Sequence, residues 1–396
     1  MPIPLFFSLP RTRGMIRRSR TIGVCLVAGF GAVACRAEPA REFRVGLLHL
    51  DSGPSETVSG VASLRGARLA VEELNAAGGV TIAGSVHRVV LIERGFEDRA
   101  DAAASAARAL VNIDRVDAII GPQFSAHAIA AASVAEVSGV PMISPMASSP
   151  AVTADRQMVS RLAFLDEFQG ALLATYAFDT LRLRRAGVLH DAASAYGQEI
   201  TRLFRATFEA RGGTVVGVET FASDAGRDHR AQLRRLIARQ PDAILLTNIG
   251  VIDSAQIVQA RALGFRGRFL GSDSWDPKLL VHVAGAEGSI VVTNWDVRTE
   301  RPSAQEFIAK YKSRYQSAPR TTAAATYDAI RILAKAVTRA GALDGAAIAR
   351  AIRESGVQEG ATSRFEFRGT GDPVRGGVIL EILQGRDSLR HVAAPR

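Results

Sequence analysis

Short apolar runs alternate with longer amphipathic segments along most of this chain, and that alternation restricts the possible folds more than any other feature. The first series predicts strands over 43–51, 88–93, 116–122 and 141–144, with helices between them over 63–79, 99–112 and 125–138. Neighbouring parallel strands need a crossover connection, so the pattern predicts a parallel sheet with helices on both faces.

A second series with the same rhythm begins at residue 167. It predicts helices over 167–181, 196–211, 228–239 and 252–264, and strands over 186–191, 214–221, 242–248 and 268–273. Two such series predict an α/β chain with two doubly wound, Rossmann-like lobes. Further helices are expected over 303–315, 321–340 and 344–355, followed by "TSRFEF" and "GGVILEILQG", which we expect to pair as late strands.

Composition supports a globular protein with two domains. The chain has 396 residues, of which 47% are hydrophobic and 22% are charged, so most of it is expected to fold. The net charge of +10 comes in part from arginines in the first 20 residues, and the remaining arginines are spread along the chain. Without a cluster on one face, this charge predicts a solvated surface and no nucleic-acid partner.

The first 35 residues follow the pattern of a secretory signal peptide, with a basic stretch, the apolar run 21–34 and then Cys35. The apolar run is shorter than the roughly 20 residues that span a bilayer. "AVAC" resembles a lipoprotein cleavage box, which would make Cys35 the lipidated first residue, and either Met1 or Met15 is the start. We expect a periplasmic protein whose internal disulfides are excluded, since Cys25 leaves with the signal.

Small polar residues follow several of the predicted strands, and ligands of open α/β sheets collect at those carboxyl ends. Ser125 and Ser148 stand beside expected helix N-termini, where backbone N–H groups and the helix dipole favour an anion. Either serine alone is equally well explained as a helix N-cap. Two such positions at adjacent strand ends favour a ligand carboxylate or phosphate.

Several segments together make the chain resemble a known family: "GARLAVEELNAAGG", "DAIIGPQFSA", "VPMISPMASSP", "VLHDAASAYGQE", "QARALGF", "FLGSDSW" and "TYDAIRILAKAV". It resembles the type I periplasmic solute-binding proteins, specifically the branched-chain amino acid binding proteins of ABC transporters. The resemblance implies two lobes joined by three hinge crossings, with a ligand held by cleft closure that a membrane permease reads. We expect residues 43–165 with 297–356 in the N-lobe, and 166–296 with 357–396 in the C-lobe.

The same resemblance implies roles for individual residues. Ser125 matches the hydroxyl that binds a ligand carboxylate, and Ser148 matches a second donor to the zwitterion. Met146 stands where a main-chain carbonyl receives the ligand ammonium, and Asp273 where an acid pairs with it. Tyr196 matches an aromatic residue that closes over the ligand side chain. The implied ligand is an amino acid or a similar zwitterion.

Other positions depart from the family pattern. Ser59 and Ile249 replace tyrosines near the side-chain pocket, so leucine, isoleucine or valine cannot be assumed as the ligand. Trp275 and Trp295 could line a pocket for a larger or aromatic ligand or pack between the lobes.

An enzyme is the first alternative, and the sequence offers no machinery for one. The histidines occur singly, and no zinc helix, phosphate loop ending in Lys-Ser or Lys-Thr, or G-x-S-x-G elbow is present. His127 is expected to be exposed on a capped helix near Ser125. We expect no cofactor, no metal and a monomer. The second alternative is a lipoprotein of the same fold that acts as a sensor or activates a protein partner.

Overall fold

The computed structural model describes residues 41–53, 59–222, 226, 228–248 and 252–394. All elements below belong to one unit, residues 40–396. The expected signal peptide, Cys35 and Ile249 lie outside the described residues. No helix among those described is long and apolar enough to cross a membrane.

The first lobe is built on a six-stranded sheet in the order β2-β3-β1-β4-β5-β6. Its strands are β1 (Glu42–Leu50), β2 (Val80–Ile82), β3 (Ser85–Phe96), β4 (Ala118–Ile120), β5 (Met142–Ser144) and β6 (Val159–Arg161). All neighbours are parallel except β2, which forms an antiparallel hairpin with β3 at the edge. The parallel order is the one that the alternation of strands and helices predicts.

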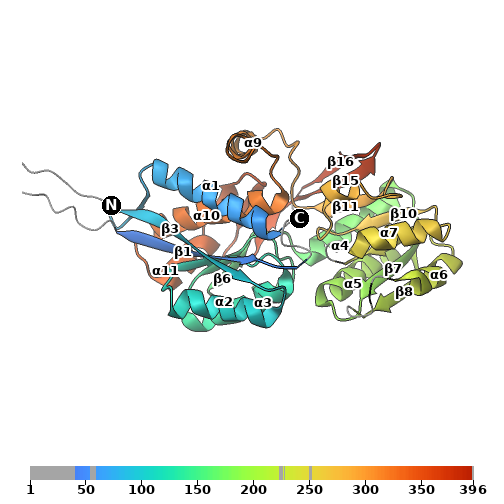
Figure 1. The fold of residues 1–396 in the computed structure, drawn as a ribbon, viewed down its shortest axis with the longest axis horizontal. Coiled ribbons are helices and arrows are strands. Elements are labelled where there is room, and N and C mark those ends of the chain that lie inside the picture. Colours follow the sequence, from blue (N-terminus) through green and yellow to red (C-terminus); the bar gives the residue numbers. More distant parts are fainter. Residues whose placement is uncertain (1–40, 54–58, 223–225, 227, 249–251, 395–396) are drawn as a thin grey trace, which may run out of the picture. The chain divides into compact units, whose positions relative to one another are not determined.

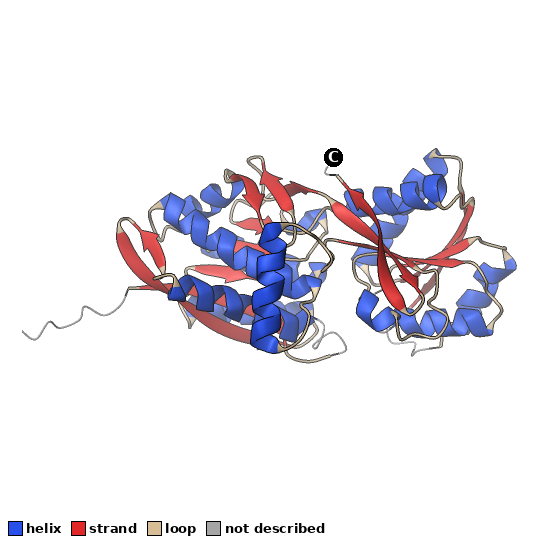
Figure 2. Cartoon of the chain, turned by 90° about the horizontal axis from the view of Figure 1, so that it is seen from above, coloured by secondary structure: helices blue, strands red, loops and turns tan. Residues whose placement is uncertain are grey.

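Helices cover both faces of this sheet, as Figure 2 shows. Strand β1 explains why, because Val45 and Leu47 face one core cluster whereas Leu48 and Leu50 face another. The first cluster contains α1 (Val61–Ala76), α9 (Pro302–Tyr315), α10 (Thr321–Ala340) and α11 (Gly345–Arg353). The second contains α2 (Ala100–Asn112) and α3 (Ser125–Ser138). The late helix α10 lies beside the early helix α1 (Figure 1), so the chain returns to the first lobe.

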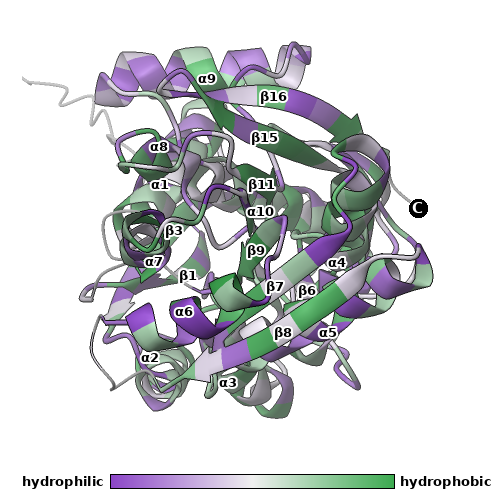
Figure 3. Cartoon of the chain, turned by 90° about the vertical axis from the view of Figure 1, so that its right-hand side faces the viewer, coloured by the Kyte–Doolittle hydropathy of each residue, from purple (hydrophilic) through white to green (hydrophobic). Residues whose placement is uncertain are grey.

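The second lobe is built on a seven-stranded sheet in the order β16-β15-β11-β10-β9-β7-β8. Its strands are β7 (Arg185–Asp191), β8 (Thr214–Phe221), β9 (Ala243–Leu246), β10 (Arg268–Gly271), β11 (Ile290–Thr293), β15 (Gly377–Leu383) and β16 (Arg386–Ala393). Strands β7 to β11 are parallel, whereas β15 and β16 are antiparallel additions. The apolar strand β15 is largely buried, and the mixed edge strand β16 is largely exposed (Figure 3).

Two further core clusters lie on the two faces of the second sheet. One contains α6 (Arg230–Ala238), α7 (Ile252–Ala262) and α8 (Pro277–Leu280). The other contains α4 (Asp166–Thr175), the single π-turn η3 (Tyr176–Thr180) and α5 (Ala195–Ala210). The predicted doubly wound architecture is therefore present in both lobes.

The last part of the chain differs from the sequence-based expectation. "TSRFEF" contributes β13 (Arg364–Phe367), which pairs with β12 (Gly356–Glu359) and β14 (Pro373–Arg375) in a separate three-stranded sheet. "GGVILEILQG" contributes β15 of the second sheet, so the expected pairing between these two runs was wrong. Phe365 and Phe367 pack in the first lobe's core, although the expected division assigned 357–396 to the C-lobe.

The chain passes between the two lobes at three places. It leaves β6 through 162–165 into α4, leaves β11 through 294–301 into α9, and passes from β14 to β15 through residue 376. The third crossing fits glycine alone, because a Cβ on Gly376 would lie 2.1 Å from the carbonyl oxygen of Ala393. These three segments are called the crossings below.

Candidate functional site

The loop after β5 and the start of α3 meet at the carboxyl end of the first sheet. The backbone N–H of Ser149 donates to Ser125 Oγ at 3.3 Å. Helix α3 begins at Ser125 itself and has no side-chain cap, so the explanation of this serine as an N-cap does not apply. Because a hydroxyl that accepts a hydrogen bond still has its own proton, Ser125 can donate to a ligand anion.

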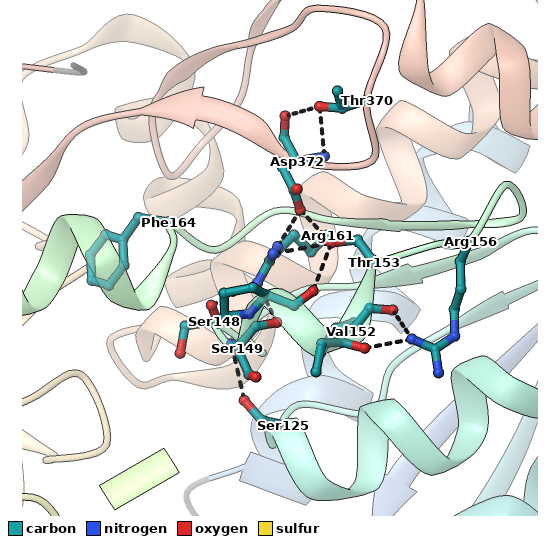
Figure 4. A network of polar contacts seen from close by, with 12 residues as sticks. Ser125, Ser148, Ser149, Val152, Thr153, Arg156, Arg161, Phe164, Thr370 and Asp372 are labelled. Atoms are coloured by element: carbon teal, nitrogen blue, oxygen red, sulfur yellow. Dashed lines mark hydrogen bonds and ion pairs between the residues drawn. The ribbon is translucent and has the colours of Figure 1, made fainter. Parts of the chain in front are cut away.

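A fully buried arginine holds this loop in place (Figure 4). Arg161 Nη1 donates to the carbonyl oxygens of Ser148 at 2.6 Å and Ser149 at 2.7 Å. Its Nε donates to Asp372 Oδ1 at 2.6 Å, and its Nη2 to Thr153 Oγ1 at 3.0 Å. The guanidinium thus orients both carbonyls of the Ser148 loop.

Helix α4 contributes two buried polar side chains that touch this loop. The backbone N–H of Asp166 donates to the Ser148 carbonyl, and Gln169 Nε2 donates to Asp166 Oδ1 at 2.8 Å. The same Gln169 amide nitrogen lies 3.4 Å from Ser148 Oγ. Burial raises the pKa of Asp166 to about 7, while the Ser148 hydroxyl and the Gln169 amide oppose that rise.

Asp273 follows β10 in the second lobe and receives several neutral hydrogen-bond donors. Tyr196 OH donates to its Oδ1 at 2.6 Å, and Asn294 Nδ2 donates to its Oδ2 at 3.1 Å. Burial raises the pKa of Asp273 to about 6, and these donors pull it downward. The carboxylate is thus desolvated and hydrogen-bonded, but the bonds that it receives from these groups bring no positive charge.

Tyr196 lies in the first turn of α5, where Ser194 caps the helix by accepting from the N–H of Gly197 at 3.0 Å. The tyrosine is half-buried. Burial raises the pKa of its hydroxyl well above the usual value, with the charges of Asp273 and Asp166 adding to that effect. Tyr196 therefore acts as a neutral donor to Asp273 across the working pH range.

The side chain of Gln169 connects the Ser148 loop to Asp273. Its Oε1 accepts from the backbone N–H of Asp273 at 3.2 Å, while its Nε2 faces Asp166 and Ser148. The structure thereby brings Ser125, Ser148, Tyr196 and Asp273 into one hydrogen-bonded network, although the sequence separates Ser125 from Asp273 by more than one hundred residues.

The other predicted positions are arranged differently. Met146 is half-buried in the loop directly after β5. Ser59 is buried just before α1, and its Oγ has no hydrogen-bond partner among the described residues. The predicted roles of both residues stay predictions, as does that of Ile249.

Both tryptophans are packed in the interior. Trp275 is 4% exposed in a core cluster of the second lobe, where its ring lies against Gly271 so closely that a Cβ there would be 2.2 Å away. Trp295 is packed in the first lobe's core and lines a cavity of about 40 Å³, which has room for water but not for an amino acid. The structure favours packing over a large ligand pocket for each.

His127 differs from its expected exposed position. It is 6% exposed, with Nε2 at 3.2 Å from Asp98 Oδ1 and its ring edge-on to Phe96 and Phe124. Its predicted lack of a catalytic role is not tested by this packing. Among the described residues no cluster of histidine, cysteine and acidic side chains could hold a metal ion.

Sequence reasoning missed several residues of the network: Arg161, Asp166, Gln169 and Asn294. A signal was available in "SRLAFLDEFQG", where an arginine precedes an apolar run and an acid begins the next helix. Polar side chains at both ends of such a run point to buried pairing, since charged groups are seldom buried alone.

Comparison with known proteins identifies the family. A family model described as periplasmic binding protein matches residues 42–386. The chain belongs to this family. The leucine-specific-binding protein of Salmonella typhimurium is 28% identical over 331 residues, which cover 82% of this chain and 86% of that protein.

Solved structures of the family have the same fold. A leucine-binding protein from Thermotoga maritima is 30% identical, with a TM-score of 0.82, and the match covers 89% of this chain and 99% of that one. The branched-chain amino acid transporter substrate-binding protein from Streptococcus pneumoniae, solved with isoleucine, is 27% identical with a TM-score of 0.82; the match covers 90% of this chain and 100% of that one. The predicted membership among type I periplasmic branched-chain amino acid binding proteins is confirmed.

Proposed function

We propose that this chain is the extracytoplasmic substrate-binding component of an ABC importer and captures an amino acid or a similar zwitterion by cleft closure. The observation that carries the proposal is the bridge made by Gln169. Its side chain contacts Ser148 of the first lobe and the Asp273 backbone of the second, so donors for an anion and an acceptor for a cation belong to one network.

The carboxylate of the ligand is assigned to the Ser125 and Ser148 side. Hydrogen bonds to a charged group contribute roughly 1.5 to 3 kcal/mol each, so two or three of them offset much of the lost hydration of a carboxylate. The Ser125 hydroxyl keeps its proton for this purpose, and Arg161 holds the loop with its own charge already met by Asp372. We also keep Met146 in the site, with its carbonyl as an acceptor for the ligand ammonium.

The ammonium is assigned to Asp273. Asp273 is half-buried and accepts side-chain hydrogen bonds from neutral donors, so a cation beside it compensates for the hydration that its carboxylate loses. Tyr196 is the group that closes on the ligand from the second lobe. The ligand's side chain is assigned to the region of Ser59 and Ile249, and these residues leave its identity open.

Export and anchoring follow from the same role. We propose that the segment ending at Cys35 is a signal peptide, that Cys35 is the lipid-anchored residue, and that a monomer delivers its ligand to a permease in the cytoplasmic membrane. The relatives named above, which bind leucine or isoleucine or are named for branched-chain amino acids, support an amino acid as the first ligand to test.

Matched ligands test the proposal directly. A thermal-shift screen over amino acids identifies the compound that raises the melting temperature, since a ligand stabilises by RT ln(1 + [L]/Kd). Calorimetry then compares that amino acid with its deaminated acid and its decarboxylated amine. We expect the zwitterion to bind about 100-fold more tightly than either, because each analogue leaves one end unpaired.

A screen in which no small molecule alters the melting temperature would overturn the proposal. That outcome would favour the sensor or partner-activating lipoprotein. Equal affinity for the zwitterion and the deaminated acid would remove Asp273 from the ligand's ammonium end.

A further inference from the structure

A second buried arginine ties the crossings together. Arg375 is the last residue of β14, next to the third crossing, and is 3% exposed. Its Nη1 donates to the carbonyl oxygen of Leu162 in the first crossing at 2.6 Å, and its Nη2 donates to that of Asn294 in the second crossing at 2.9 Å. One guanidinium therefore fixes the spacing of all three segments that join the lobes.

Asn294 links this arginine to the candidate site. Its side-chain Oδ1 accepts from the backbone N–H of Phe164 in the first crossing at 3.1 Å, and its Nδ2 donates to Asp273 Oδ2 at 3.1 Å. A backbone N–H can only donate, so it determines which end of the amide faces Phe164. The other end must then present its N–H groups to Asp273.

We propose that Asn294 is a positioning residue for Asp273 and that, through Arg375, it connects this carboxylate to all three crossings. The inference rests on the proposed function, because it gives the ligand ammonium at Asp273 a direct hydrogen-bonded route to the hinge. A ligand that draws the Asp273 carboxylate toward itself also pulls on the Asn294 side chain that donates to it. Asn294 is bound to the third crossing through its carbonyl, which accepts from Arg375, and to the first crossing through its side chain, which accepts from Phe164.

The electrostatic surroundings of Asp273 support a titration test. The titratable or charged groups that face it are the Tyr196 hydroxyl from α5, the Asp166 carboxyl from α4 and the Arg375 guanidinium from β14. Burial lowers the pKa of Arg375 to about 10, and the Asp273 charge opposes that change. The Asn294 hydrogen bond lowers the pKa of Asp273, so removing the amide should raise it.

Substitutions at Asn294 separate positioning from general structural support. Asn294→Ala removes both bonds, whereas Asn294→Asp keeps an acceptor for Phe164 and loses the donor to Asp273. We expect Asn294→Ala to weaken zwitterion binding at pH 7 by about 10- to 100-fold, as for one hydrogen bond to a charged group. The pH below which affinity falls should move upward in both variants, and further in Asn294→Asp.

Asn75→Ala is the matched control, because Asn75 also uses both ends of its amide, here on the backbone of Val89 in the first lobe and away from Asp273. It should leave affinity and its pH dependence unchanged. Arg375→Lys keeps the charge but cannot donate to two carbonyls in a fixed fork. We expect this variant to keep the pH profile and to alter the ligand-induced change in radius of gyration measured by small-angle scattering.

The outcomes distinguish this inference from the proposed function. If the wild-type chain binds no zwitterion, the proposed function fails, and carbon NMR titration of Asp273 in unliganded wild-type and Asn294→Ala chains still tests the positioning. An unchanged Asp273 titration, or unchanged affinity and pH profile in Asn294→Ala, would overturn it. Arg375→Lys with a wild-type response in scattering would remove the link to the hinge.

Discussion

The Ser148 loop and the Asp273 carboxylate lie at two ends of one hydrogen-bonded network, but they are stabilised in opposite ways. At the Ser148 loop, the charged group is the Arg161 guanidinium, which is already paired with Asp372 and with two backbone carbonyls. At Asp273, the hydrogen bonds come from neutral Tyr196 and Asn294. The loop is complete before a ligand arrives, whereas the carboxylate gains its counter-charge from the ligand.

This difference indicates where pH and mutation should act. A preorganised loop contributes through geometry, so its failure should reduce stability and affinity together. A carboxylate with a raised pKa contributes through charge, so its failure should change affinity and its pH dependence while leaving the fold in place.

The largest expected effect is the loss of Arg161. Arg161→Ala should lower the free energy of unfolding by about 3 to 5 kcal/mol, because it removes four hydrogen bonds made by a buried guanidinium. Each is worth roughly 1.5 to 3 kcal/mol, and the relieved cost of burying the charge offsets part of the sum. Denaturant unfolding of both chains measures the change. Arg161→Lys, which keeps the charge but not the forked contacts, should recover only part of it. Stability within error of wild type for Arg161→Ala would show that the loop does not depend on this charge.

The charge of Asp273 is tested next. Asp273→Asn should weaken zwitterion binding by about 100- to 1000-fold, since the ligand ammonium would be buried without its partner. Calorimetry gives the affinity, and the thermal transition of the unliganded chain should stay near that of wild type or rise. Asp179→Asn is the control, because Asp179 is an exposed acid of the same lobe paired with Arg211. Equal affinities for both variants would place the ammonium elsewhere.

The pH dependence of binding should follow Asp273. Its pKa is about 6 in the unliganded chain, and an ammonium bound beside it would lower that value. The deprotonated form is therefore the one that binds, so affinity should be constant above about pH 7 and fall below pH 6 by up to about tenfold per unit. Asp166, with a pKa of about 7, titrates close to it and broadens the transition.

Asp273→Asn should remove most of this pH dependence. The dependence that remains should come from Asp166, whose carboxyl contacts the Ser148 loop and has a pKa of about 7. A wild-type profile that is flat over that interval would contradict the assignment of the cation to Asp273.

The sequence predicted the regular elements well because their signals are local. The predicted helix over 321–340 and strand over 214–221 agree with α10 and β8 residue for residue. Strand β6 was missed because it has three residues and includes Arg161, so neither its length nor its composition signals a strand. The "TSRFEF" run was recognised as a strand, but its partners are decided by tertiary packing.

The candidate site likewise contains residues with a local sequence signal and residues without one. Ser125 and Ser148 could be proposed because each follows a predicted strand, and parallel strands end at one edge. Asp273 was proposed from the resemblance to the family. Arg161 could not, because its partner Asp372 is 211 residues further along the chain and no local pattern joins them. Asn294 could not be predicted either, because its two side-chain contacts, Phe164 and Asp273, lie in other segments of the chain. Buried polar pairs of this kind are visible only after folding.

The smallest expected effect is at Ser125. Ser125→Ala removes one donor to the ligand carboxylate, and should weaken binding by about 10-fold, at the low end for a hydrogen bond to a charged group. Ser125→Thr keeps the hydroxyl and should bind more tightly than Ser125→Ala. The pH profile should retain its wild-type shape in both, because the titrating group is intact.

The unchanged pH profile expected for the Ser125 variants distinguishes the role of the Ser148 loop from that of Asp273. If Ser125→Ala lowers the affinity but leaves the pH midpoint of binding unchanged, the loop contributes through the position of its donors and Asp273 through its charge. A shifted midpoint would instead mean that the Ser125 hydroxyl influences the titration of Asp273 through the loop and Gln169, whose side chain contacts both Ser148 and Asp273. In that case the loop would respond to ligand charge as well as to ligand shape, and the contrast between the two ends would not hold.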